Sequence, residues 1–179
     1  RASEINCALG LSQLIRLKAS VQKRKMIASI YKKHLKSVSY LSFPSDAFTS
    51  KYNSWHLFSI FIDFNKLGIK RRDIIKKLEK YGIGTQVHYI PLFLQPYYKN
   101  LPSTNYNGAI EYYEKNLSLP MYVSLKEKDV IYICDRIKSV LNKLDATKLQ
   151  LLNFKSILSS GNQKINLYPK LNSIDKMST

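Results

Sequence analysis

Acidic residues and arginine are scarce in this chain of 179 residues. Only 12 Asp and Glu stand against 29 Lys and Arg, which gives a net charge of +17, and only six of the basic residues are arginines. Arginine is the residue that most often forms bidentate hydrogen bonds with phosphates and bases. The lysines are spread almost evenly from Lys18 to Lys176, and no helix-turn-helix, RNA-recognition or zinc-finger signature accompanies them. We therefore expect solvated surface lysines and no nucleic-acid partner; the alternative is a small basic module that binds an anionic partner.

Cysteines and long apolar runs are also rare. Cys7 and Cys134 lie far apart and form no metal-ligand or redox spacing, so we expect two reduced thiols in a cytoplasmic protein without a metal site. No apolar run reaches the roughly 18 residues of a membrane span, and no secretory signal opens the chain. Because the chain opens on Arg1 and a helical sequence follows at once, we expect a piece of a longer protein, produced by cloning, cleavage or a disrupted gene.

Helical spacing dominates the beginning of the chain. Apolar residues recur at this spacing from Ile5 to Leu35, which predicts one long helix, or two helices with a bend near Ser20. The part up to Leu17 is apolar almost all round, so we expect it to be buried between two bodies. We interpret residues 1–37 as a linking helix at a domain or dimer seam.

The rest of the chain alternates between strand-like and helix-like patterns, and 45% of its residues are hydrophobic. We predict an α+β fold, a small antiparallel sheet of about three strands with helices on one face, over residues 38–144. Trp55 is interpreted as packing within the second strand. Residues 145–179 are interpreted as a divergent tail that is expected to be disordered, with a further helical turn or two over residues 147–158 as the alternative for its first part. The predicted strands cover residues 38–43, 54–64 and 85–90, and the predicted helices residues 71–81, 109–117 and 126–144.

The stretch from Gly82 to Tyr98, GIGTQVHYIPLFLQPYY, is the densest in aromatic residues, glycine and proline. Gly82 is expected to end a helix in the left-handed conformation. Alternation predicts the strand over residues 85–90, and Pro91 ends it because proline cannot donate to a ladder. The aromatic run that follows is too apolar for a solvated loop, so it is expected to lie against a pocket, a partner or a ligand.

Four segments carry a resemblance to a known family. They are RASEINCALGLSQL at the start, SWHLF from Ser54, KYGIGTQVHYIP together with LQPYY, and LSLPM from Leu117. In this order and spacing, over Arg1 to Leu144, they resemble the DegT/DnrJ/EryC1/StrS sugar aminotransferases, which are fold-type I enzymes dependent on pyridoxal phosphate. The QVHYIP and LQPYY details are most similar to the branch that aminates a UDP-4-keto-6-deoxy-N-acetylhexosamine on the way to pseudaminic acid.

The resemblance implies the small C-terminal domain and linking helix of such an enzyme. The complete enzyme would be a homodimer that transfers an amino group, from glutamate, to a 4-keto-6-deoxy nucleotide sugar for surface polysaccharide synthesis. In this family the larger N-terminal domain supplies the Schiff-base lysine and the aspartate that pairs with the pyridine nitrogen. No lysine here sits in that lysine motif, so we expect neither pyridoxal phosphate binding nor catalysis from this chain alone. The alternative is a split enzyme, completed by a complementing N-terminal chain.

The resemblance also assigns half of a site, without a catalytic residue. Arg1 ends a loop that in these dimers reaches the cofactor phosphate of the other subunit; a salt bridge at the domain seam is the alternative. His88 and Tyr89 are expected substrate contacts, with a neutral imidazole that donates to or accepts from a sugar hydroxyl or a diphosphate oxygen. Tyr97 and its neighbour Tyr98 would stack on a nucleotide base or form the wall of the pocket.

Overall fold

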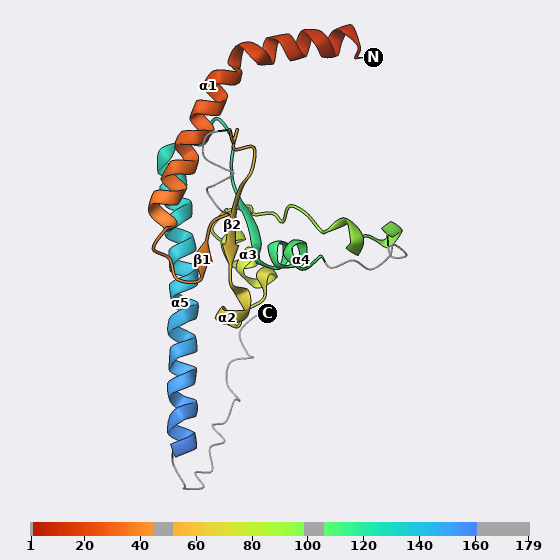
Figure 1. Ribbon diagram of the computed structural model, residues 1–179. Coiled ribbons are helices and arrows are strands. Elements are labelled where there is room, and N and C mark those ends of the chain that lie inside the picture. Colours follow the sequence, from red (N-terminus) through yellow and green to blue (C-terminus); the bar gives the residue numbers. More distant parts are fainter. Residues whose placement is uncertain (1, 45–51, 99–105, 161–179) are drawn as a thin grey trace, which may run out of the picture.

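The structure, a computed structural model, describes residues 2–44, 52–98 and 106–160, with side chains described up to residue 152 (Figure 1). Arg1, the expected cofactor-side residue, lies outside the described residues. The helices and strands, in chain order, are α1 (Glu4–Leu35), β1 (Leu41–Ser42), β2 (Phe58–Ile62), α2 (Phe64–Leu67), α3 (Arg71–Glu79), the short 3₁₀ helices η2 (Leu92–Leu94) and η3 (Pro96–Tyr98), α4 (Asn107–Lys115), β3 (Asn116–Leu119) and α5 (Glu127–Ser160).

Helix α1 is a single helix of 32 residues. The Ser3 hydroxyl caps its first turn by accepting a hydrogen bond from the Asn6 N–H at 3.3 Å. Figure 1 shows that α1 bends, and that only its later part runs alongside α5 while its N-terminal part extends away from the body. The first part, which we expected to be buried, is exposed within this chain: Ile15 is 86% and Ile5 81% exposed.

The sheet has the order β1-β2-β3, and both pairs are antiparallel. Side chains alternate along the central strand β2, so that Phe58, Ile60 and Ile62 are buried. They lie against α1 and α5, where the Phe58 ring stacks on Tyr31 with centroids 4.8 Å apart. On the opposite side of β2, Phe61 meets Tyr112 of α4 edge to face at 5.2 Å. The predicted α+β class with a small three-stranded antiparallel sheet is confirmed, with α4 as an addition on the second face.

The third strand is not the segment that the sequence indicated. Residues 85–90 form only an isolated bridge, Gln86 to Ser118, and the third strand of the sheet, which pairs with β2 on the side opposite β1, is β3. Beyond this bridge the backbone N–H of Asn116 donates to the Tyr112 carbonyl at the end of α4, and the His88 carbonyl accepts the side-chain amide of Asn116 at 3.0 Å instead. The alternation of β3 escaped prediction because it is four residues long and follows a helix without a break.

Strand β2 is also shorter than predicted at its beginning. Trp55 has a φ of 53°, which lies in the left-handed region, so the extended backbone cannot start there. The Asn53 side chain accepts a hydrogen bond from the Trp55 N–H at 2.7 Å and fixes this turn. Placing Trp55 on the strand was therefore wrong, although its packing role is confirmed: the ring lies 5.7 Å from that of Phe58, and the Lys32 ammonium lies 5.1 Å from its centre.

Helix α5 continues beyond the point where we expected it to end. It runs to Ser160, so that residues 147–158 adopt the helical alternative and the expectation of disorder is wrong up to residue 160; residues 161–179 lie outside the described part. Two contacts attach the start of this extension to the body. The Tyr40 hydroxyl donates to Asp145 Oδ1 at 2.9 Å, and the Lys148 ammonium donates to the Lys66 carbonyl.

Candidate functional site

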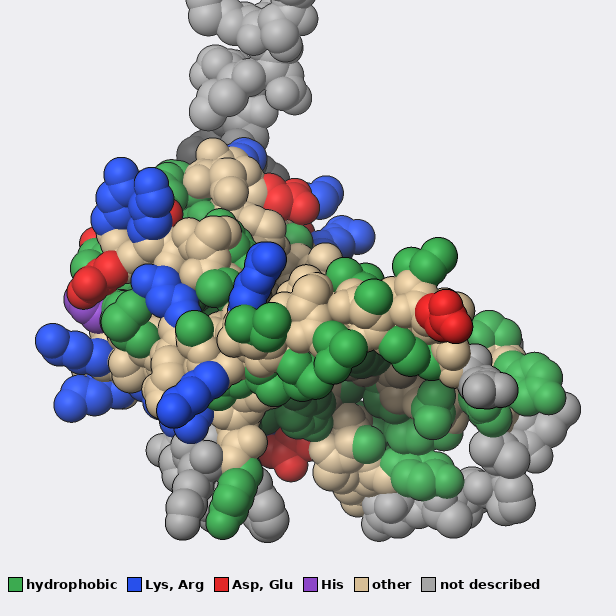
Figure 2. All heavy atoms as spheres, turned by 90° about the horizontal axis from the view of Figure 1, so that it is seen from above, with side chains coloured by type: hydrophobic (Ala, Val, Ile, Leu, Met, Phe, Trp, Pro, Cys, Tyr) green, Lys and Arg blue, Asp and Glu red, His purple; other side chains and the backbone are tan. Residues whose placement is uncertain are grey.

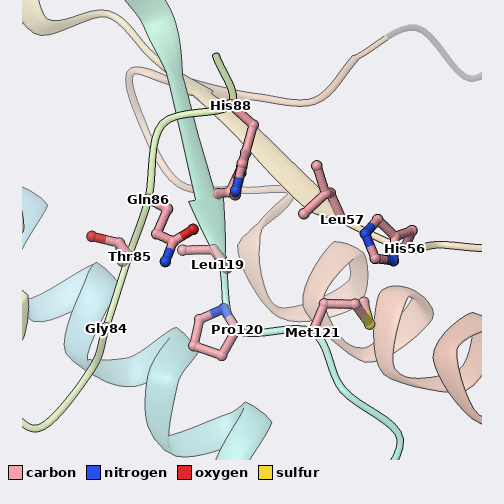
Figure 3. A pocket seen from close by; sticks show the side chains of 10 residues that line it. His56, Leu57, Gly84, Thr85, Gln86, His88, Leu119, Pro120 and Met121 are labelled. Carbon is pink, nitrogen blue, oxygen red and sulfur yellow. The ribbon is translucent and has the colours of Figure 1, made fainter.

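A hollow of about 300 Å³ lies where the segment from Gly84 to His88, the end of β3 and the residues before β2 meet (Figure 3). The hollow is lined by polar side chains together with apolar ones such as Leu57, Leu119 and Met121. Its lining residues are His56, Leu57, Gly84, Thr85, Gln86, His88, Ser118, Leu119, Pro120 and Met121.

A glycine turn directs the chain into this hollow. Gly82 has a φ of 73°, the left-handed conformation that was predicted for the end of α3. The buried Ile83 follows and donates its N–H to the Leu78 carbonyl at 3.1 Å. The chain then runs along the free edge of β3, where Gln86 and Ser118 exchange backbone hydrogen bonds of 3.2 and 2.8 Å. This short bridge holds the backbone against β3 two positions before His88.

His88 is held by side chains of β3 at two atoms. Its Nδ1 lies 2.8 Å from the Ser118 hydroxyl, and its carbonyl accepts the Asn116 amide at 3.0 Å. Ser118 also shares a hydrogen bond of 3.1 Å with Ser59 of β2, the residue directly opposite it in the sheet. The imidazole lies over the hollow (Figure 3) and is half-buried. The structure therefore places His88, a predicted site residue, at the hollow, with its ring and its carbonyl both hydrogen-bonded to β3.

The other predicted contacts lie outside the hollow. Tyr89 is 71% exposed and touches His88 edge to face, with ring centroids 4.7 Å apart. Tyr97 is 89% exposed and touches the ring of Tyr98. Figure 1 shows that η2 and η3 extend away from the sheet. For Tyr89 and Tyr97, contact with a substrate stays a prediction.

The hollow also contains residues to which the sequence gave no role in the site. His56, which we placed on a core strand, is exposed and lines the hollow instead. Ser118 is buried and meets both Ser59 and His88. A signal for Ser118 existed, because it is a polar residue between two leucines that alternate with it, as in a strand with one apolar face.

Tyr31 of α1 fixes the loop that follows β3. Its hydroxyl donates to the Pro120 carbonyl at 3.0 Å, next to the hollow. Burial raises the pKa of Tyr31 far above its ordinary range, with smaller contributions from Cys134 and Tyr122. The hydroxyl therefore keeps its proton and remains a donor to Pro120 at any ordinary pH.

The lining residues do not fit pyridoxal phosphate by themselves. The hollow, as the described residues form it, contains no lysine for an imine, no carboxylate for the pyridine nitrogen, and no arginine or lysine for the phosphate. Its polar groups are imidazole, hydroxyl, amide and backbone groups, which suit uncharged polar ligands. Within the described ranges, no group of three or more His, Cys, Asp and Glu side chains is placed to hold a metal ion.

The long helix, the small three-stranded sheet and the hollow beside it are matched as a fold by known proteins. The chain belongs to the DegT/DnrJ/EryC1/StrS aminotransferase family, whose model matches residues 1–138. The enzymes of this family depend on pyridoxal phosphate.

Two curated relatives and one solved structure illustrate the similarity. The spore coat polysaccharide biosynthesis protein SpsC of Bacillus subtilis is 32% identical over 146 residues, 79% of this chain and 37% of the relative. The UDP-4-amino-4,6-dideoxy-N-acetyl-beta-L-altrosamine transaminase of Campylobacter jejuni is 32% identical over 145 residues, 80% of this chain and 38% of the relative. Helicobacter pylori PseC, an aminotransferase involved in the biosynthesis of pseudoaminic acid, superposes with a TM-score of 0.71 at 29% identity, over 80% of this chain and 38% of that one. The chain thus spans less than two fifths of the length of these proteins.

Exposed apolar side chains form a further feature of the surface. In Figure 2, hydrophobic side chains gather on one half of the face shown, whereas most lysines and arginines lie on the other half. On α1, the exposed apolar side chains include Leu9, Leu11, Leu14 and Leu17, which are between 50% and 66% exposed. None of the helices in the described ranges combines the length and the apolar character that crossing a membrane requires.

Proposed function

We propose that this chain is the C-terminal part of a nucleotide-sugar aminotransferase that uses pyridoxal phosphate in the cytoplasm. The complete enzyme would be a homodimer that transfers an amino group from glutamate to a 4-keto-6-deoxy nucleotide sugar. As substrate class we favour a UDP-linked N-acetylhexosamine, as in the branch related to the altrosamine transaminase. Alone, the chain would be inactive, because its lysines do not match the family's catalytic-lysine motif.

The observation that carries this proposal is the hollow beneath His88. Its imidazole, hydroxyl and amide groups are of the kinds that bind sugar hydroxyls and carbonyls, and it contains no charged side chain that would reject a neutral sugar ring. The exposed tyrosines Tyr89 and Tyr97 stand on the segment that leaves it. We propose that they contact the nucleotide part of the substrate once a second body completes the site.

The exposed apolar part of α1 supports a missing second body. Side chains such as Ile5, Leu9 and Ile15 are between 58% and 86% exposed on one stretch of helix, which is unusual for a free-standing domain. We propose that they lie against the cofactor domain of the same enzyme. The same surface favours the second candidate, a split enzyme in which a separate N-terminal chain provides that domain.

Incubation of the purified chain with pyridoxal phosphate tests the proposal. We expect no absorbance of an internal aldimine and no label on any lysine after borohydride reduction, because the hollow presents no lysine. If the aldimine forms only when this chain is co-expressed with a lysine-bearing N-terminal domain, the result supports the split enzyme. A stable yellow complex of this chain alone, reducible onto one of its own lysines, would overturn the proposal.

A further inference from the structure

Strand β3 contains two buried polar side chains, Asn116 and Ser118, on the face that points away from α1 and α5. Asn116 is fully buried and Ser118 is 3% exposed, whereas the intervening Leu117 and the following Leu119 are buried in the apolar core. A buried polar side chain costs free energy unless it is hydrogen-bonded. In a sheet this small, the two polar residues therefore require a specific reason.

Both side chains form hydrogen bonds with one residue, His88. Asn116 donates its amide to the His88 carbonyl at 3.0 Å, and Ser118 shares a hydrogen bond of 2.8 Å with Nδ1 of the ring. The other side-chain atom of Asn116, the oxygen Oδ1, is buried without a hydrogen-bond partner among the described residues. Backbone and ring are thus both fixed from the strand that lies beneath them.

The hydroxyl of Ser59 extends the contact into a chain of three side chains. Ser59 and Ser118 are directly opposite each other in the sheet, and their oxygens lie 3.1 Å apart. Each hydroxyl has one hydrogen to donate. If Ser59 donates to Ser118 and Ser118 donates to Nδ1 of His88, both hydroxyl hydrogens have an acceptor, and the remaining hydrogen, on Nε2, faces the hollow that His88 lines.

The opposite direction leaves one hydrogen unused. With the proton on Nδ1 of His88, the ring would donate to Ser118 and Ser118 to Ser59, and the half-buried Ser59 hydroxyl would then need a further acceptor. No such acceptor for Ser59 is present among the described residues. The first direction leaves its remaining hydrogen at the open hollow, where solvent or a ligand can accept it, whereas the second leaves it on the half-buried Ser59. Because a donor without an acceptor is more costly the more it is buried, the first direction is favoured.

We infer that the hydroxyl chain from Ser59 through Ser118 holds neutral His88 in the tautomer that carries its proton on Nε2. The ring then presents an N–H donor at the hollow, and Nδ1 is unavailable for a ligand. The group that binds there is an acceptor oxygen, a hydroxyl, carbonyl or phosphate oxygen of the substrate. Ser59, Ser118 and Asn116 are positioning residues; only the identity of the ligand depends on the proposed function.

The tautomer can be measured on the chain itself. With ¹⁵N-labelled histidine, long-range ¹H–¹⁵N spectra in mildly alkaline buffer show which ring nitrogen carries the proton. The chain has only three histidines, and the spectrum of the His88→Gln variant assigns the signal of His88. We expect a single neutral form protonated on Nε2, and a mixture of both tautomers in Ser118→Ala.

Two further variants separate this role from a loss of packing. Ser59→Ala leaves the Ser118–His88 contact in place but removes the donor that orients it, so we expect a smaller population of the Nδ1–H tautomer than in Ser118→Ala. Ser29→Ala removes an exposed hydroxyl that donates to the Met26 carbonyl on α1, and should leave the His88 signal unchanged. An Nδ1–H tautomer in the unmodified chain would overturn the inference, even if Ser118→Ala fails to fold. An aldimine on this chain would refute the proposed function and leave the tautomer result standing.

Discussion

Tyr31 of α1 and Cys134 of α5 place two ionisable groups inside the core. Both side chains are completely buried. Burial raises the pKa of Tyr31 far above its usual range and raises that of the Cys134 thiol from 9.0 to about 12. In the folded chain both groups stay neutral, whereas in the unfolded chain they ionise at their ordinary values.

This difference predicts a loss of stability in alkaline solution. The contribution of Cys134 is complete below pH 9.0, its unfolded value, and is lost as the pH rises toward about 12. At about 1.4 kcal/mol per pH unit, the free energy of unfolding should fall by on the order of 2 kcal/mol by about pH 10.5. Urea unfolding between about pH 8 and pH 10.5 measures it.

Two variants assign the effect to Cys134. Cys134→Ala should be less stable at every pH because of the lost side chain, but with a shallower fall above about pH 9. Cys7→Ala changes an exposed thiol and should reproduce the original slope. An unchanged slope in Cys134→Ala would show that burial of this thiol has no influence on the pH dependence.

Among the elements, α5 differs most from expectation. Its early part packs against α1 through buried residues such as Ile133 and Ile137, whereas Leu149, Leu151 and Leu152 of the extension are more than half exposed. An exposed helical extension gains little from packing, so its stability depends on local attachments. The Tyr40 hydroxyl and the Lys148 ammonium provide these attachments.

Removing one attachment should loosen the extension. In Tyr40→Phe the hydrogen bond to Asp145 Oδ1 is lost, and we expect faster amide hydrogen exchange in residues 146–152, with no change in the part of α5 that packs on α1. Tyr122→Phe, which removes a hydroxyl from a half-exposed side chain in the loop before α5, is the control. Equal exchange in both variants would mean that the Asp145 contact does not hold the extension.

The molecule as a whole combines a well-formed core with a long apolar surface on the first part of α1. The core is closed by α1, α5 and the sheet, and it does not include Ile5, Leu9 or Ile15. These side chains therefore contribute little to the folding of this chain. Their apolar area should instead drive association, either with the cofactor domain that we propose or with other copies of this chain.

Substitution at this surface should separate folding from association. Ile15→Glu should change the free energy of unfolding by no more than about 0.5 kcal/mol, because the side chain is 86% exposed. It should also raise the concentration at which the chain self-associates in sedimentation experiments. Gln13→Glu adds the same charge to the exposed helix surface without removing apolar area. If both variants behave alike, charge and not apolar contact governs association.

The sequence by itself determined the features that depend on local pattern. Helical periodicity predicted α1, α3 and the first part of α5, and the φ of 73° at Gly82 bears out the turn predicted for that glycine. The segments that resemble the sugar aminotransferases predicted the family, and the fold class followed from the order of helices and strands. The helices and the turn need only neighbours in the sequence, because helix and strand periods repeat within a few residues, whereas the family and the fold class need the order of segments along the chain.

Only the tertiary structure decided which groups meet His88. Its partners Asn116 and Ser118 lie 28 and 30 residues further along the chain, and Ser59, which is bonded to Ser118, is 59 residues away from it. The same long-range pairing made β3 a strand and left residues 85–90 with a single bridge. Hydrogen-bond partners that are brought together by the sheet register leave no periodic signal in the sequence. The sequence therefore named His88, and the fold determined how its ring is held.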